Sequence, residues 1–129
     1  MKFTIDKKEK YTYFKIDEDN LNSVLAPKLK SEFVLLINEG APNLILDLSS
    51  VKFIDSSGLS SILTANRLWE RSQQAFVLIG IEQPAVKKLI AISRLDTILT
   101  IIPTKKEAVE YIYMDILEKE ITTEGNDEE

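Results

Sequence analysis

The stretch Phe53-Ile54-Asp55-Ser56-Ser57-Gly58-Leu59-Ser60 is the most informative part of this chain, because it joins a predicted strand to a predicted helix. Residues 43–48 before it form a short apolar run typical of a buried strand, and residues 59–73 after it repeat apolar side chains with a helical period. The junction is therefore expected to be exposed and rigid. In α/β folds, functional sites usually lie at the carboxyl end of a central strand.

The residues of this junction suit both a structural and a functional role. Asp55 or Ser56 can cap the first backbone amides of the helix, and Gly58 allows another backbone segment to come close. Because the helix dipole favours an anion at its amino terminus, a phosphoryl group on a serine here would be tolerated. Asp-Ser-Ser is also a common way to begin any helix, so capping alone is an alternative that the motif leaves open.

The composition predicts a single domain and excludes several kinds of site. The chain has 129 residues, enough to bury one apolar core, and contains neither cysteine nor histidine. Disulfides, thiolate nucleophiles, Cys/His zinc sites and histidine acid–base pairs are therefore excluded. An enzyme would have to use carboxylates, hydroxyls and lysines, and no cofactor is expected.

The charge pattern indicates a nearly neutral folded body with an acidic end. The net charge is −5, and residues 120–129 hold five acids and no base, so the remainder has 21 − 5 = 16 acids against 16 bases. This polar segment is predicted to be disordered. We expect neither nucleic-acid binding, because Lys and Arg are scattered, nor a membrane span. The amino terminus alternates like a strand and does not resemble a signal peptide, which predicts a cytoplasmic protein.

Strand and helix patterns alternate along the chain. Residues 3–5 and 11–16 predict a hairpin, and strands follow at residues 44–48, 75–80 and 98–101. Helices are predicted from Ser23 to about Gly40, over residues 57–73 and 83–92, and after a Thr104 cap, the last with Ala108, Ile112 and Leu117 on its apolar face. The fold class is therefore α/β: a mixed, mostly parallel sheet opened by an N-terminal hairpin and flanked by about four helices.

The chain resembles the STAS family, in particular the bacterial anti-sigma factor antagonists. The resemblance spans about residues 1–116, so a STAS domain is expected over residues 1–119 and the acidic tail over residues 120–129. Three stretches carry it: Leu25-Ala26-Pro27-Lys28-Leu29; residues 44–59, which read Leu-Ile-Leu-Asp-Leu-Ser-Ser-Val-Lys-Phe-Ile-Asp-Ser-Ser-Gly-Leu; and Pro84-Ala85-Val86-Lys87-Lys88-Leu89 followed by Ser93-Arg94-Leu95.

This resemblance implies a phosphorylation-switched regulator of transcription that is not an enzyme. The family's phosphate acceptor falls on Ser56, with Asp55, Ser57 and Gly58 in support. Unphosphorylated members bind an anti-sigma factor with serine kinase activity and so free the sigma factor. A metal-dependent serine phosphatase reverses the modification. The residues expected to contact the partner are Asn20, Asn22, Leu59 and Lys87.

Two positions depart from the family's pattern. Asn22 falls where the family often has an aspartate, and Asp17, Glu18 and Asp19 could supply the missing charge. Arg94 follows Ser93 where a glycine is usual, which is expected to change a turn.

The sequence also fits other interpretations. The chain could be a STAS subunit that never carries phosphate, as in a lipid-transport ABC complex or a stress-signalling scaffold. An enzyme could use Asp47, Asp55 and Ser56, although no base is visible to activate the serine. Lys87 could lie on a solvated helix face, and the spacing of Leu59 also fits the core.

Overall fold

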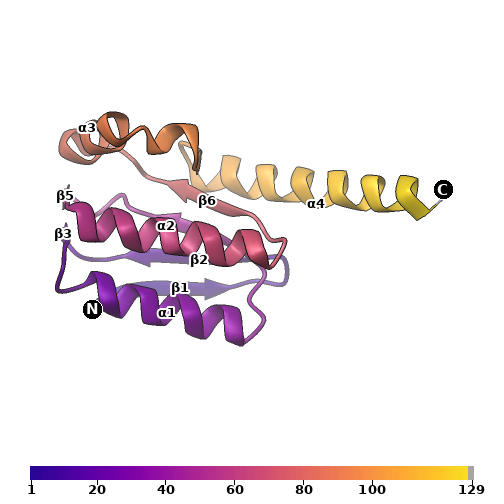
Figure 1. Ribbon diagram of the computed structural model, residues 1–129, viewed down its shortest axis with the longest axis horizontal. Helices are drawn as coiled ribbons and strands as arrows, with labels where there is room; N and C mark the ends of the chain where they lie inside the picture. The colour runs from indigo at the N-terminus through magenta and orange to yellow at the C-terminus, as the bar shows by residue number, and fades with distance from the viewer. Residues whose placement is uncertain (128–129) are drawn as a thin grey trace.

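The sheet has five strands with one antiparallel edge. A computed structural model describes the backbone of residues 1–127 and the side chains as far as residue 122. The strands are β1 (Phe3–Lys7), β2 (Tyr11–Ile16), β4 (Asn43–Asp47), β6 (Phe76–Ile79) and β7 (Thr100–Ile101). Their order is β1-β2-β4-β6-β7, where β1 pairs antiparallel with β2 and all other pairs are parallel. Figure 1 labels β1, β2 and β6 of this sheet. The N-terminal hairpin and the mixed, mostly parallel sheet are thus confirmed.

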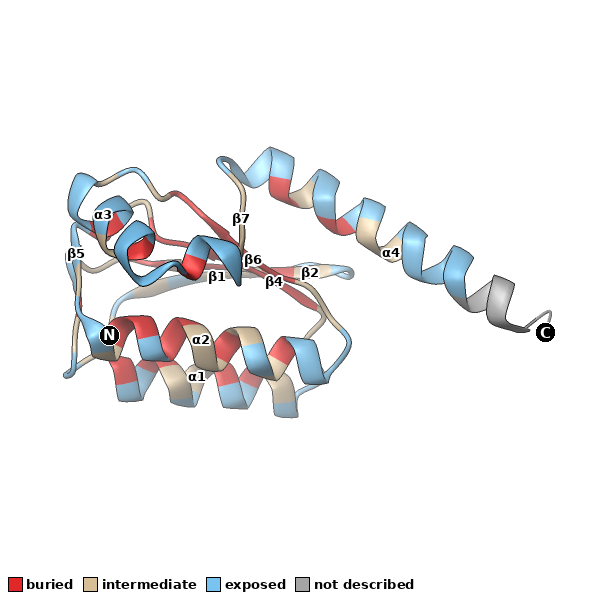
Figure 2. Ribbon diagram, turned by 45° about the horizontal axis from the view of Figure 1, so that its top comes forward, coloured by how far each residue is buried: buried red, intermediate tan, exposed pale blue. Residues whose placement is uncertain are grey.

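Helices cover both faces of this sheet. The helices α1 (Ala26–Asn38), α2 (Ser56–Arg71) and α3 (Pro84–Ser93) bury their apolar stripes in one core cluster together with Leu44 and Leu46 of β4. The helix α4 (Lys105–Asp127) packs Ala108 and Ile112 in a second cluster with Ile45. Successive side chains of a strand point to opposite faces, so β4 serves both clusters and is buried along its whole length. Figure 2 shows α1 and α2 side by side beneath the sheet.

The segment before α1 and the segment before α2 are joined by a second, two-stranded sheet. Strands β3 (Asn20–Leu21) and β5 (Phe53–Ile54) pair in parallel. The carbonyl oxygen of Asp19 also accepts hydrogen bonds from the backbone N–H groups of Lys52 and Phe53, at 2.8 and 3.1 Å. This pairing, which is not among the predicted elements, places the amino termini of α1 and α2 next to each other.

The carboxyl-terminal part differs from the prediction in three ways. A short 3-10 helix, Leu95–Thr97, precedes the last strand, and that strand covers only Thr100–Ile101 of the expected residues 98–101. Leu117 is 48% exposed rather than buried, because this part of α4 runs beyond the end of the sheet (Figure 1). The acidic segment is helical from Glu120 to Asp127, where disorder was predicted, and residues 128–129 lie outside the described part. Strong helix formers at residues 118–120 continue the helix.

Within the described part of the chain, no helix combines the length and the apolar character needed to cross a bilayer.

Arg94 ends α3 in a conformation that favours glycine. Its φ of 58° and ψ of 25° lie in the left-handed region, and its N–H donates to the carbonyl of Ala91. An L-residue pays roughly 1–2 kcal/mol for this conformation, whereas glycine reaches it freely. Arg94 therefore lies in a helix-terminating turn, where glycine would avoid this strain.

We expect Arg94→Gly to stabilise the protein. Relief of the left-handed strain outweighs the greater entropy of glycine in the unfolded chain, which costs about 0.5–1 kcal/mol, so the net gain should be about 0.5–1 kcal/mol. Urea denaturation followed by the fluorescence of Trp69 measures it. Arg94→Ala is the matched control, since alanine suffers the same strain. A gain as large for alanine as for glycine would show that the arginine side chain, and not the backbone, is responsible.

Candidate functional site

Asp55 and Ser56 begin α2 as the junction predicts. Asp55 is the N-cap residue in an extended conformation, and its Oδ1 accepts a hydrogen bond from the backbone N–H of Gly58 at 3.0 Å. Ser56 is the first residue of the helix and is exposed, whereas Ser57 is half-buried. Because Asp55 caps the helix, the hydroxyl of Ser56 is not required for that role and is accessible from solvent.

Gly58 allows the close backbone contact predicted for it. A Cβ atom at this position would lie 2.4 Å from the carbonyl oxygen of Leu21 and 2.6 Å from Cγ1 of Ile54. The same Leu21 oxygen accepts a hydrogen bond from the N–H of Asp55 at 3.2 Å. The first turn of α2 is therefore packed directly on the β3–β5 pair, which fixes where Ser56 lies.

Ser56 lines a small pocket between α1 and α2. The pocket has a volume of about 250 Å³ and is lined from α2 and its start by Ser56, Ser57 and Ser60. The other side is formed by Ser23, Ala26, Pro27 and Lys30. Lys30 Nζ donates a hydrogen bond to Ser60 Oγ at 3.2 Å. Hydroxyl groups and one ammonium group thus surround the candidate phosphate acceptor.

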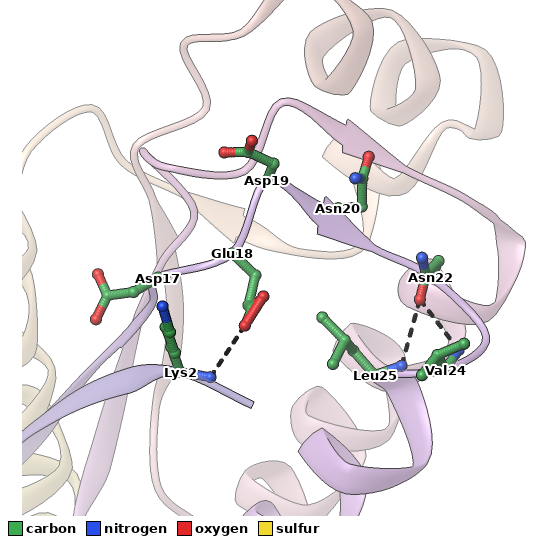
Figure 3. A pocket seen from close by; sticks show the side chains of 8 residues that line it. All are labelled: Lys2, Asp17, Glu18, Asp19, Asn20, Asn22, Val24 and Leu25. Carbon is green, nitrogen blue, oxygen red and sulfur yellow. Dashed lines mark hydrogen bonds between the residues drawn. The ribbon is translucent and has the colours of Figure 1, made fainter.

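Asn20 and Asn22 line a different pocket, shown in Figure 3. The Oδ1 atom of Asn22 accepts hydrogen bonds from the N–H groups of Val24 and Leu25, at 3.0 and 3.3 Å, so a neutral amide organises the turn before α1. The three acids of the preceding loop line this pocket too, but they point in different directions (Figure 3) and bind Thr4, the Lys2 N–H and Lys52. The three acids therefore line the same pocket as Asn22, and each of them contacts another residue.

The two remaining residues expected to contact a partner differ in exposure. Lys87 lies on the exposed face of α3. Leu59 is only 9% exposed and packs in the core cluster, so its expected role as an apolar contact is wrong. Its helical position turns it toward the sheet. The exposed apolar side chain near Ser56 is instead Phe53, which is 60% exposed.

Comparison with known proteins shows the family. The STAS domain family matches residues 2–108. This chain belongs to the STAS domain family. Comparison with curated protein sequences gives no match.

Solved STAS structures share the fold over nearly the whole chain. A putative anti-sigma factor antagonist from Thermotoga maritima is 26% identical with a TM-score of 0.76, covering 86% of this chain and 94% of its own. An anti-sigma factor antagonist from Mycobacterium paratuberculosis is 21% identical, with a TM-score of 0.74 and coverages of 87% and 93%. The Bacillus cell fate determinant SpoIIAA in its phosphorylated form is 19% identical, with a TM-score of 0.66 and coverages of 86% and 99%.

Asp47 of this STAS domain is separated from Ser56 by the sheet. It lies on the face covered by α4, where its Oδ2 accepts a hydrogen bond from the Tyr13 hydroxyl and its Oδ1 accepts one from the Ser49 N–H. Burial of Tyr13 and the Asp47 carboxylate together raise the pKa of the phenol far above its usual value. Asp47 therefore ties the end of β4 to its neighbours, and the catalytic combination of Asp47 with Asp55 and Ser56 is not assembled.

Lys30, Ser23 and Ser60 are site residues that the sequence did not reveal. Ser56 and Ser60 are one helical turn apart on α2, whereas Ser23 lies in the turn before α1 and Lys30 lies on α1. Only the packing of these two helices brings the four residues to one pocket. Within the described residues, no cluster of three or more carboxylates suitable for a metal ion is present.

We expect Gly58→Ala to destabilise this STAS domain. Alanine is the better helix former, but its Cβ would overlap the Leu21 carbonyl, and overpacking of this kind costs about 1–3 kcal/mol. Urea denaturation reports the change. Ser56→Ala, two residues away on the exposed surface, is the control and should stay within about 0.5 kcal/mol of wild type. A Gly58→Ala protein as stable as wild type would disprove the close contact.

Proposed function

We propose that this STAS protein is an anti-sigma factor antagonist whose binding is switched off by phosphorylation of Ser56. In its unphosphorylated form it binds an anti-sigma factor with serine kinase activity in the cytoplasm and thereby releases the sigma factor. That kinase phosphorylates Ser56 and ends the complex, and a metal-dependent serine phosphatase restores the binding form. The protein itself acts as a regulatory binding protein.

The observation that carries this proposal is that Ser56 is exposed, while other residues provide the contacts that hold the first turn of α2 in place. Asp55 provides the cap and Gly58 the packing, so the Ser56 hydroxyl can be modified without removing a structural contact. Solved relatives described as anti-sigma factor antagonists, among them SpoIIAA in a phosphorylated form, support the assignment.

The surface around Ser56 also suits a partner that is sensitive to charge. Two large apolar side chains are exposed here: Phe53 in the segment that precedes α2 and Val24 in the turn that precedes α1. A phosphate adds about −1.5 to −2 charges beside the exposed Asp55. Desolvating that charge in an interface is unfavourable, and it repels an acidic partner, so the complex dissociates.

A STAS subunit that never carries phosphate remains the alternative. The presence of Asp55, Ser56 and Ser57 together, with Ser56 exposed, favours the phosphorylated class. The two functions differ in one measurable property, which is whether Ser56 gains a phosphoryl group from an anti-sigma factor kinase.

The test uses the purified protein, ATP and the anti-sigma serine kinase encoded in the same genome. Wild type should gain one phosphoryl group by intact mass, Ser56→Ala should gain none, and Ser57→Ala should still be modified, because Ser57 only supports the acceptor. In binding assays, Ser56→Ala should hold the kinase in the presence of ATP. Ser56→Asp should bind at least about tenfold more weakly than Ser56→Ala, which corresponds to about 1.4 kcal/mol.

The two serine variants control for each other, since they are neighbours on one helix. Phosphate on Ser57, or equal affinities of the Ala and Asp variants at position 56, would exclude Ser56 as the switch and leave the non-phosphorylated STAS subunit as the better assignment.

A further inference from the structure

Lys30 brings a positive charge into the pocket that Ser56 lines. Its side chain is half-buried on α1, and its Nζ donates a hydrogen bond to Ser60. Among the described residues that line this pocket, Lys30 is the one with a charge, and the others are serines, Ala26 and Pro27. No carboxylate in the described part of the chain forms an ion pair with it. The ammonium group is therefore held by a neutral hydroxyl, which a stronger acceptor can replace.

The position of Ser60 places this ammonium within reach of Ser56. The two serines are four residues apart on α2, and such side chains are neighbours on one helix face, with about 5–6 Å between their Cβ atoms. The Nζ of Lys30 already lies 3.2 Å from Ser60 Oγ. A lysine has a flexible four-carbon stem, and a phosphate extends further from the helix than the serine hydroxyl does. Contact requires only a side-chain rotation.

We propose that Lys30 binds the phosphate when Ser56 is phosphorylated, exchanging its hydrogen bond to Ser60 for an ion pair with the phosphate oxygens. This inference rests on the proposed function, because it takes Ser56 as the acceptor. Charge-assisted hydrogen bonds are roughly twice as strong as neutral ones, so the exchange is favourable. Lys30 belongs to α1 and Ser56 to α2, and the ion pair therefore joins the N-terminal parts of the two helices.

The exchange also determines how the phosphate is presented to a partner. Two charged groups act on the phosphate. Asp55 is exposed, precedes Ser56 in the chain and repels the phosphate, whereas Lys30 attracts it across the pocket. Before phosphorylation the charges of Asp55 and Lys30 cancel. After phosphorylation, Asp55, Lys30 and the phosphate together carry a charge of about −1.5 to −2. Lys30 would hold this charge in the groove between α1 and α2 and would itself no longer be free to contact the partner.

The test measures the pKa of the phosphate itself. Phosphoserine is incorporated at position 56 during translation, so no kinase is needed, and the phosphorus resonance is followed by NMR as a function of pH. A nearby cation favours the dianion and lowers the second pKa of the phosphate. Lys30→Gln should therefore raise this pKa by about 0.3–0.7 units relative to the wild-type phosphoprotein. Lys30→Arg keeps the charge and should keep the low value.

Lys28→Gln is the matched control, because Lys28 lies on the exposed surface of α1 outside the pocket. Its phosphate pKa should equal that of wild type. Equal pKa values in wild type and Lys30→Gln would overturn the proposal, and so would an equal rise in Lys28→Gln, which would indicate a general charge effect. A lowered wild-type pKa combined with a failed kinase assay would contradict the proposed function alone.

Discussion

The contact between the Leu21 carbonyl and the first turn of α2 is the constraint on which the site depends. This oxygen accepts a hydrogen bond from the Asp55 N–H and occupies the space that a side chain at position 58 would fill. Only glycine permits both. The contact joins the segment before α1 to the segment before α2, and the amino termini of these helices consequently lie together. The serines of α2 and the lysine of α1 share a pocket for this reason.

The sheet separates this pocket from a second cluster of polar groups. On the face covered by α4, Asp47 binds Tyr13 and Ser49, and the Lys105 Nζ lies 4.2 Å above the centre of the Tyr13 ring. Gly80, with a φ of +73°, leaves the space that Asp47 occupies. These groups satisfy one another, which is how a carboxylate and a phenol are accommodated beside an apolar cluster. Asp47 therefore serves the scaffold, and the opposite face carries the surface proposed for regulation.

In the first turn of α2, the residues that hold the turn in place are different from the residue proposed to be modified. A modification can therefore act without unfolding the protein. The groups that hold the turn are the Asp55 carboxylate, the Gly58 backbone and the buried Leu59 side chain. Ser56 is exposed and takes part in none of these contacts. A phosphate at this position changes the charge presented to other molecules, while the core beneath it is unaffected. Among the described residues that line the pocket, Lys30 is the one with a positive charge, and in the proposed phosphorylated form it would limit the repulsion within the molecule.

The local sequence determined most helices and strands and much of the structure of the first turn of α2. Apolar periodicity predicted the hairpin, the buried strand β4 and the four helices, and residue chemistry predicted the Asp55 cap and the role of Gly58, because these depend on neighbours a few residues away.

Only the tertiary structure decided the rest. Two-residue strands such as β3 and β5 are too short to show an alternating pattern, so their pairing is invisible in the sequence. The burial of Leu59, the exposure of Leu117 and the placing of Asp47 on the far face follow from where the sheet lies and ends. Lys30 contacts Ser60 because α1 packs against α2, and these helices are distant in the sequence. A local sequence pattern holds no information about such long-range contacts.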